Sequence, residues 1–402
     1  MPKEHLKLNE DGPIDGFRPL TTAEREASLR LRTVLEKIPF VDLDAGLTAL
    51  PPGRHWTPSF ALNLDCPGGN CQGGNRQGDD AGRSETNRLT LVCGVVAQPF
   101  PRQVRALILE MSEYLRELPP DALVKSAYPV ILASHLSEQS RALCLEAGFG
   151  FADFSGSCRL CFDRIFIETQ GTRTTSAAKR EMRSPFTPKA AALLRILLKE
   201  PKRSWKVMDL AEASGVSLGH VSNLRKALIN REWAEVGLEG LRLTRPDAVL
   251  DAWTALISTS KPGARIDVKR CYTTLHGVRL RDAIKAALAE AGSGAHAVLA
   301  GASAAQWLAP YVRVGSQEFY ADALGEDILN RHLSLSPADK GANVMITRTD
   351  DGDILSDRIE PAPGIWTTGL VQTYLDLNTS GERHAEAADH LRRFMLDPLW
   401  KT

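Results

Sequence analysis

Four cysteines form the first group of residues whose type and spacing point to chemistry. Cys66 and Cys71 form a Cys-x4-Cys pair, and Cys158 and Cys161 form a Cys-x2-Cys pair. Two such pairs can close a tetrahedral zinc site or hold an iron–sulfur cluster, which would make the protein a metal-binding or redox-sensing regulator. However, Cys158 and Cys161 lie in a strand-like run, where residues three apart point to opposite faces. The alternative is that these cysteines are buried as small apolar side chains.

A second group of candidate residues lies late in the chain. The stretch AGASAAQWLAPYV places Gly301 and Ser303 in a turn before a helix, and QEFYAD adds Glu318 and Asp322. Nucleotidyltransferases place a Gly-Ser turn before paired Asp residues that bind two metal ions. Glu318 and Asp322 are expected on one face of a strand but about 13 Å apart, which is too far to bridge a metal. We therefore expect Ser303 to act as a helix N-cap and the region not to transfer nucleotides.

The stretch WKVMDLAEASGVSLGHVSNLRKALINREW predicts a helix-turn-helix in the middle of the chain. Gly215 allows the tight turn between the helices, and Ser217 is expected to cap the second helix through its hydroxyl. Val221, Leu224 and Leu228 recur at helical spacing and predict its buried face. The following WAEVGLEGLRLTRPDAVLDAW predicts a strand, a hairpin, a strand and a helix, which is the layout of a wing.

The second predicted helix exposes short polar and basic side chains, which suits the major groove of DNA. Base readout is expected from Ser217, Gly219, His220 and Asn223, and Ser222 lies on the same face. Phosphate contacts are expected from six basic residues, namely Arg203, Lys206, Arg225, Lys226, Arg242 and Arg245. The alternative is a winged helix that serves only as a scaffold for protein contacts.

Charge is unevenly distributed although the net charge of the chain is zero. Residues 171–257 contain 15 Lys and Arg against 9 Asp and Glu, and residues 258–317 contain 8 against 3. Residues 318–402 reverse this balance, with 8 basic and 15 acidic residues. The basic region includes the predicted helix-turn-helix, where attraction to phosphates is needed.

The order of strand-like and helical runs predicts a mixed α/β and α+β protein of several domains. An α/β sheet is expected at 40–170, interrupted by a Gly-rich insert at 66–87 whose composition cannot form a core. The full expected order is a polar lead and helix at 1–39, the α/β domain at 40–170, a basic linker at 171–184, the winged helix-turn-helix at 185–257 and an α+β domain at 261–402.

Composition excludes several classes of protein. Hydrophobic residues make up 43% and charged residues 24% of the 402 residues, as in soluble globular proteins. No apolar run approaches the ~20 residues of a membrane span, and the polar N-terminus has no apolar signal core. Seven cysteines without framework spacing fit a reducing compartment. We expect a cytoplasmic protein without a membrane partner or a bound cofactor.

Several stretches, taken in order, are similar to one family. They are PFPRQVRALI, YPVILASHLSEQSRALCLEAGFGFADFSGSCRL, the helix-turn-helix, VLAGASAAQWLAPYV and TTGLVQTYLDLNTSGERHAEAADHLRR. The chain resembles the long bacterial AbiEi-like proteins, which are regulators and antitoxins of type IV toxin–antitoxin systems. The resemblance implies a degenerate restriction-endonuclease-like domain, a winged helix and a C-terminal antitoxin-type domain. The Gly-rich insert with its cysteines departs from this pattern.

The resemblance also indicates where nuclease residues would lie. Endonuclease-like sheets bind Mg²⁺ with an acidic residue and the Glu of a Glu-x-Lys motif, whose Lys stabilises charge near the attacking water. Aligned on PFPRQ, the Glu and Lys positions fall near Gly94 and Val96, and neither can perform these roles. Asp65 remains as the acidic residue. A nuclease or nucleotidyltransferase is therefore the alternative reading, and we expect no catalytic residues.

Together these patterns predict a sequence-specific repressor that binds double-stranded DNA. A single winged helix binds weakly, so we expect a homodimer on an inverted repeat. The acidic C-terminal region is the candidate for contacting a partner protein, such as a basic toxin, or for dimerisation.

Overall fold

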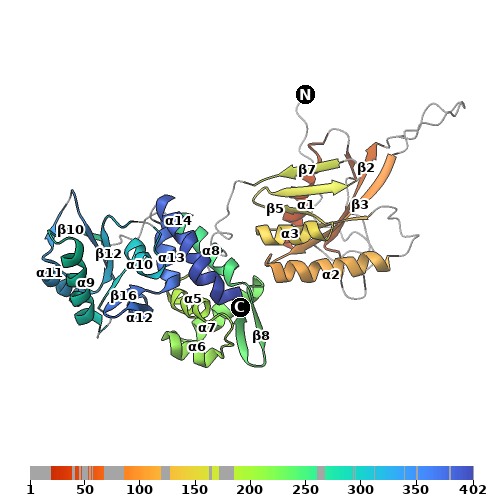
Figure 1. Cartoon of the computed structure of the whole chain (residues 1–402). Helices are drawn as coiled ribbons and strands as arrows, with labels where there is room; N and C mark the ends of the chain where they lie inside the picture. The colour runs from red at the N-terminus through yellow and green to blue at the C-terminus, as the bar shows by residue number, and fades with distance from the viewer. Residues whose placement is uncertain are drawn as a thin grey trace, which may run out of the picture. The chain divides into compact units, whose positions relative to one another are not determined.

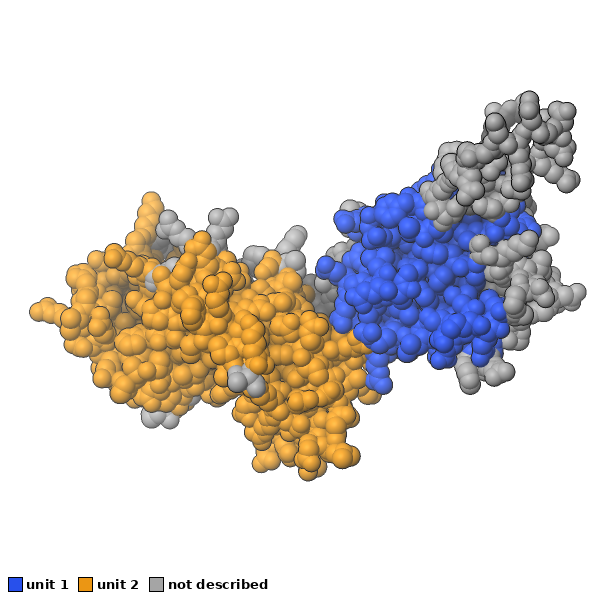
Figure 2. Space-filling view, turned by 45° about the vertical axis from the view of Figure 1, so that its right-hand side comes forward, with its two compact units in different colours: residues 1–181 blue, residues 182–402 orange. Residues whose placement is uncertain are grey.

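A computed structural model of the chain forms two compact units, residues 1–181 and 182–402 (Figure 2). The structure describes residues 20–38, 41–44, 47, 53, 56, 58–67, 86–118, 127–162, 165–171, 185–259, 268–292, 294, 296–311, 313–338, 340–349, 352–379 and 382–401. Each unit contains a seven-stranded sheet with helices, so the predicted mixed α/β organisation of a multidomain chain is confirmed.

The sheet of the first unit runs in sequence order from β1 to β7 (Figure 1). Its strands are β1 (Asp42–Leu43), β2 (Phe60–Pro67), β3 (Thr86–Val96), β4 (Ala127–Ala133), β5 (Gly150–Asp153), β6 (Cys158–Phe162) and β7 (Ile165–Thr169). The central strands β3, β4 and β5 are parallel, and the outer pairs are antiparallel. Parallel neighbours need crossover connections, and helices α2 (Pro101–Glu117) and α3 (Glu138–Glu146) provide them.

Helices cover both faces of this sheet. Helix α1 (Thr22–Leu35) starts with a capping box between Thr21 and Glu24, and its buried Leu31 packs on one face with Phe60. Helices α2 and α3 form a second core on the other face, where Met111 packs with Ile131. The strands are therefore buried on both sides, which explains their nearly continuous apolar runs.

The second unit begins with a helix–hairpin module, which we define as residues 185–259. It contains α5 (Pro188–Lys199), α6 (Val207–Ser214), α7 (Leu218–Asn230), the hairpin β8 (Ala234–Gly237) and β9 (Gly240–Leu243), and α8 (Pro246–Thr259). Gly215 ends α6 with a φ of 66°, a left-handed conformation that glycine adopts without strain. The chain can therefore turn directly from α6 into α7.

The hairpin of this module gains a third segment from Trp205. The backbone N–H and C=O of Trp205 exchange hydrogen bonds of 2.8 Å with those of Leu241. Gly240 makes this approach possible, because a Cβ there would lie 2.3 Å from the Trp205 carbonyl oxygen. Its φ of 127° is also a conformation that favours glycine.

The second sheet has the order β13-β10-β14-β12-β11-β16-β15. Its strands are β10 (Val268–Tyr272), β11 (Ala297–Leu299), β12 (Gln317–Ala321), β13 (Ser336–Pro337), β14 (Val344–Arg348), β15 (Arg358–Ala362) and β16 (Ile365–Thr368). Helices α9 (Gly277–Gly292) and α11 (Ala323–Leu333) pack on it around Phe319 and Ile346. The remaining helices are α10 (Gly301–Leu308), α12 (Gly352–Ser356), α13 (Leu370–Thr379), α14 (Glu382–Leu391), the π-helix η1 (Arg392–Leu396) and α15 (Asp397–Lys401).

One apolar core joins the helix–hairpin module to the C-terminal helices. Leu194 of α5 and Leu250 of α8 belong to the same buried cluster as Val371 and Leu375 of α13 and Ala388 of α14. The Trp400 ring nitrogen also donates a 3.0 Å hydrogen bond to the Leu198 carbonyl. The module and the second sheet are therefore parts of one compact unit (Figure 1).

Within the described part of the chain, no helix is both long and apolar enough to span a lipid bilayer.

Candidate nucleic-acid interface

Helix α7 has one buried and one exposed face. Val221, Leu224 and Leu228 are buried in the module core, as the helical spacing predicts. The exposed face carries four residues that were predicted to contact DNA, which are Gly219, His220, Asn223 and Lys226. Two further predicted residues, Ser222 and Arg225, are half-buried at its border. The helix therefore presents an amide, an imidazole and an ammonium group together to solvent.

Ser217 occupies the predicted N-cap position of α7, but its side chain does not cap the helix. Its Oγ lies 2.9 Å from Nδ1 of His220 instead. The prediction of a side-chain cap was therefore wrong, because a histidine three residues later competes for the hydroxyl. This contact orients the imidazole and leaves its Nε2 without a partner among the described residues, so that nitrogen can bond to an external group.

The six predicted phosphate contacts fall into two groups. Three arginines each form an ion pair with a carboxylate of the chain. Arg203 pairs with Glu200 at 2.9 Å, Arg242 with Glu235 at 2.5 Å, and Arg245 with Asp247 at 3.3 Å. Lys206, Arg225 and Lys226 have no acidic partner among the described residues. The second group can bind an anion without first losing an ion pair.

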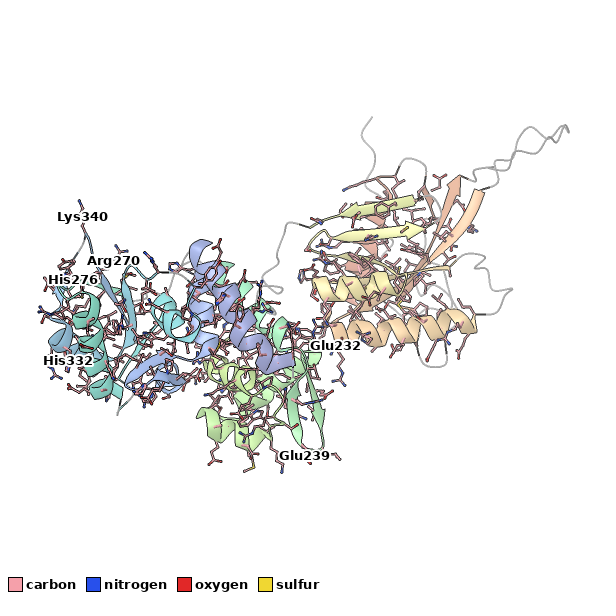
Figure 3. The ribbon with its side chains drawn as sticks, in the orientation of Figure 1. Glu232, Glu239, Arg270, His276, His332 and Lys340 are labelled. Carbon is pink, nitrogen blue, oxygen red and sulfur yellow. The ribbon has the colours of Figure 1, made fainter. Side chains whose placement is uncertain are left out.

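The hairpin carries more acidic than basic groups near its turn. Glu235 and Glu239 are exposed, and Glu239 lies at the far end of the hairpin (Figure 3). Leu238, between them, is fully exposed. Arg242 is the nearby cation and is already paired with Glu235. The hairpin turn is therefore an acidic and apolar surface, which sequence reasoning missed because it counted the arginines without their partners.

Of the four candidate cysteines, Cys158 and Cys161 are the two whose side chains the structure describes, and these two do not share a site. Cys158 is buried and Cys161 is exposed, because they point to opposite faces of β6. Burial raises the pKa of the Cys158 thiol to about 12, which keeps it protonated. Cys66 is in β2, opposite Asn87 of β3. Cys71 lies outside the described residues. In the described part of the chain, no three His, Cys, Asp or Glu side chains are arranged to hold a metal ion.

The two positions where the sequence resemblance places a nuclease Glu and Lys, Gly94 and Val96, are occupied by packing residues. A Cβ on Gly94 would lie 2.8 Å from the Met111 sulfur, so this site accommodates no larger side chain without rearrangement. Val96 belongs to the core between the sheet and α2. Asp65 pairs with Arg88 on the neighbouring strand. Since Arg88 is six residues from Gly94 along β3, Asp65 lies about 20 Å from that position.

The glycine turn before α10 differs from the predicted arrangement. Ser303 does not cap α10, because its hydroxyl accepts a 2.9 Å hydrogen bond from the Glu318 N–H and donates to the Ser316 carbonyl. Asp322 is not on the strand with Glu318; it caps α11 and accepts a 2.6 Å hydrogen bond from His296. The strand prediction failed because β12 ends at Ala321 and not one residue later.

The same turn binds two carboxylates of the chain. The backbone N–H of Ala302 donates to Glu318 at 3.2 Å, and the backbone N–H of Gly301 faces the Asp376 carboxylate of α13, which opposes the rise in the pKa of that group. Burial raises the pKa of Glu318, and it raises the pKa of Asp376 to about 7. Amides that would cradle a phosphate in a nucleotide site are therefore already engaged.

Asp376 is the centre of a buried polar chain that no sequence pattern indicated. Its Oδ1 accepts hydrogen bonds from the Tyr320 hydroxyl at 3.0 Å and from Gln372 Nε2 at 2.8 Å. The side-chain amide oxygen (Oε1) of Gln372 accepts a 3.1 Å hydrogen bond from Arg195 of α5. The chain of contacts thus runs from the first helix of the helix–hairpin module to β12 of the second sheet. Its partners are distant in sequence, so local periodicity contains no signal for it.

Comparison with known proteins identifies one family. Residues 242–397 match the family model described as a transcriptional regulator, AbiEi antitoxin, of type IV toxin–antitoxin systems. The match begins in β9 and covers α8, the second sheet and its helices, but not α6 and α7. No curated protein and no solved structure matches the chain significantly. Residues 242–397 are therefore similar to the AbiEi-type family of transcriptional regulators and antitoxins, in agreement with the resemblance of the sequence motifs.

Proposed function

We propose that the protein is a sequence-specific DNA-binding repressor and that the helix–hairpin module is its winged helix-turn-helix. The single observation that carries this proposal is the exposed face of α7, where Gly219, His220, Asn223 and Lys226 lie together beside a buried stripe. Asparagine reads adenine through two hydrogen bonds, and a glycine lets the helix approach the groove closely. The family of the C-terminal region consists of transcriptional regulators, which agrees with this role.

The ion pairs of the module separate the six predicted phosphate-binding residues into main and smaller contributors. Lys206, Arg225 and Lys226 have no described acidic partner and are assigned as the main phosphate-binding residues. Lys206 also precedes the N-terminus of α6, where the helix dipole favours a negative charge. Arg203, Arg242 and Arg245 must release a carboxylate before they bind a phosphate, so their contribution is smaller.

We further propose that the protein does not catalyse a reaction. Gly94 and Val96 offer no metal ligand or general acid at the endonuclease-like positions. At the glycine turn, Glu318 accepts a hydrogen bond from the backbone, and Asp376 accepts one from the Tyr320 hydroxyl. Paired metal-binding carboxylates would need these groups free and adjacent.

The repressor is expected to act as a homodimer, because one winged helix covers too few base pairs for specific binding. Because residues 242–397 match an antitoxin family, the protein is also expected to bind a protein toxin through its C-terminal region. Residues 318–402 carry 15 acidic and 8 basic residues, so a basic toxin surface fits by charge. Co-purification with the product of a neighbouring toxin gene tests this contact, and charge reversal of exposed Glu386 and Asp389 should weaken it.

DNA binding is tested by fluorescence anisotropy with the purified full-length protein. The probe is the DNA upstream of its own gene, and an unrelated duplex of equal length is the competitor. Asn223→Ala should weaken binding to the cognate DNA about tenfold and leave binding to the unrelated duplex unchanged. Lys226→Ala should weaken both and reduce the slope of log K against log salt by about 0.9.

Lys340→Ala is the matched control, since Lys340 is an exposed lysine at the other end of the second unit (Figure 3). It should behave as the unmodified protein with both duplexes. Equal losses for Asn223→Ala and Lys226→Ala on both duplexes would contradict the assignment of base readout to Asn223. No salt-sensitive binding to any duplex would refute the repressor and favour a scaffold for protein contacts.

A further inference from the structure

Helix α7 leaves one apolar side chain exposed at its first residue. Leu218 precedes Val221 by three residues but is turned about 60° around the helix axis from it, toward the half-buried border residues Ser222 and Arg225. Val221 is 1% exposed, whereas Leu218 is 52% exposed. The first turn of α7 therefore extends past the core that buries the rest of its apolar face.

The surroundings of Leu218 leave its outer side open. A Cβ on the next residue, Gly219, would have no heavy atom within 4 Å. His220 is exposed and oriented by Ser217. Leu218 thus stands beside bare backbone, on the first turn of α7, which the proposed function brings deepest into the major groove.

We propose that Leu218 determines specificity by contacting the C5 methyl group of a thymine in the major groove. This inference rests on the proposed DNA binding by α7. Of the four bases, thymine alone presents a methyl group there, and apolar side chains are the groups that recognise it. An exposed leucine gains from this contact because it removes apolar surface from water. A leucine at the first residue of α7 offers no hydrogen bond, so the methyl is the feature of the base edge that it can read.

The contact predicts a defined effect of removing one methyl group. Uracil differs from thymine only by lacking this methyl and keeps its hydrogen-bonding edge. Burial of one such group changes an equilibrium constant by about fourfold. A single thymine-to-deoxyuridine replacement in each half-site should therefore weaken binding by about that factor, and the effect should depend on Leu218.

The experiment first selects preferred duplexes from random DNA with the full-length protein. Each thymine of the selected site is then replaced singly by deoxyuridine, and binding is measured by anisotropy. At one position per half-site the unmodified protein should lose about fourfold in affinity. Leu218→Ala should bind thymine and deoxyuridine equally at that position. The control Leu238→Ala removes the exposed leucine at the hairpin turn and should retain the fourfold difference.

Two results would overturn the inference alone. Either every deoxyuridine duplex binds the unmodified protein as well as its thymine counterpart, or Leu218→Ala keeps the difference at the sensitive position. In both cases the selected duplex is still bound, so the repressor function stands. Failure to select any duplex would instead overturn the proposed function and this inference with it.

Discussion

Replacement of the buried Asp376 by asparagine tests how burial controls the stability of the second unit. Asp376 lies within α13 and accepts hydrogen bonds from Tyr320 and Gln372. Burial raises its pKa from 3.8 to about 7, against the opposing effect of these hydrogen bonds. The folded protein therefore holds the Asp376 proton more tightly than the unfolded chain does.

The sign of the pH dependence follows from this difference. Between pH 4 and pH 7 the folded state binds more protons than the unfolded state, so the free energy of unfolding falls as the pH rises. For pKa values of 3.8 and about 7, this group makes the protein about 3 kcal/mol more stable at pH 5 than at pH 8. The amide introduced by Asp376→Asn does not titrate, and its oxygen can still accept from Tyr320 and Gln372.

The assay is urea unfolding followed by tryptophan fluorescence. Six of the seven tryptophans lie in the second unit, and Trp56→Phe removes the one in the first unit. In this background Asp376→Asn should reduce the stability difference between pH 5 and pH 8 by about 3 kcal/mol. It should also unfold at a higher urea concentration than the parent at pH 8. An unchanged pH dependence after the substitution would refute the reasoning that burial of Asp376 sets this difference.

Three further predictions concern the hairpin and the first sheet. Glu235→Gln should free Arg242 and tighten DNA binding several-fold at low salt. In anisotropy titrations the slope of log K against log salt should become steeper by up to about 0.9. Weaker binding would contradict the view that Glu235 restrains this arginine. Gly240→Ala should lower the melting temperature of the second unit, because its Cβ would collide with the Trp205 carbonyl; an unchanged melting curve would show that the hairpin does not depend on this approach. The protein should not cleave plasmid DNA with Mg²⁺ or Mn²⁺, and cleavage that Asp65→Ala abolishes would show that the first sheet has kept a nuclease site.

Local patterns predicted much of the helix–hairpin module. The spacing of Val221, Leu224 and Leu228 defines one buried stripe, and glycine at 215 is the residue that a left-handed helix end requires. The alternation of strands and helices likewise predicted the α/β character of the first unit. These features depend on residues a few positions apart, so they can be read from the chain directly.

Contacts between distant residues could not be predicted in this way. The bridge between Trp205 and Leu241 depends on the return of the chain through a hairpin. The Asp376–Tyr320 hydrogen bond joins residues 56 positions apart. The neutralisation of Arg242 by Glu235 depends on strand register, which determines which charges face each other. Counts of basic residues therefore overestimated the number of cations without an acidic partner.

The common interior of α5, α8, α13 and α14 limits how this protein can be divided or rebuilt. A fragment that stops near residue 260 would deprive α5 and α8 of their packing partners and leave apolar faces in water. The helix–hairpin module is thus not an independent part that could be transferred to another protein without its C-terminal partners. If the proposed function holds, a toxin bound to α13 or α14 would contact helices that share this interior with α7, so binding at one surface would affect the other through the common core.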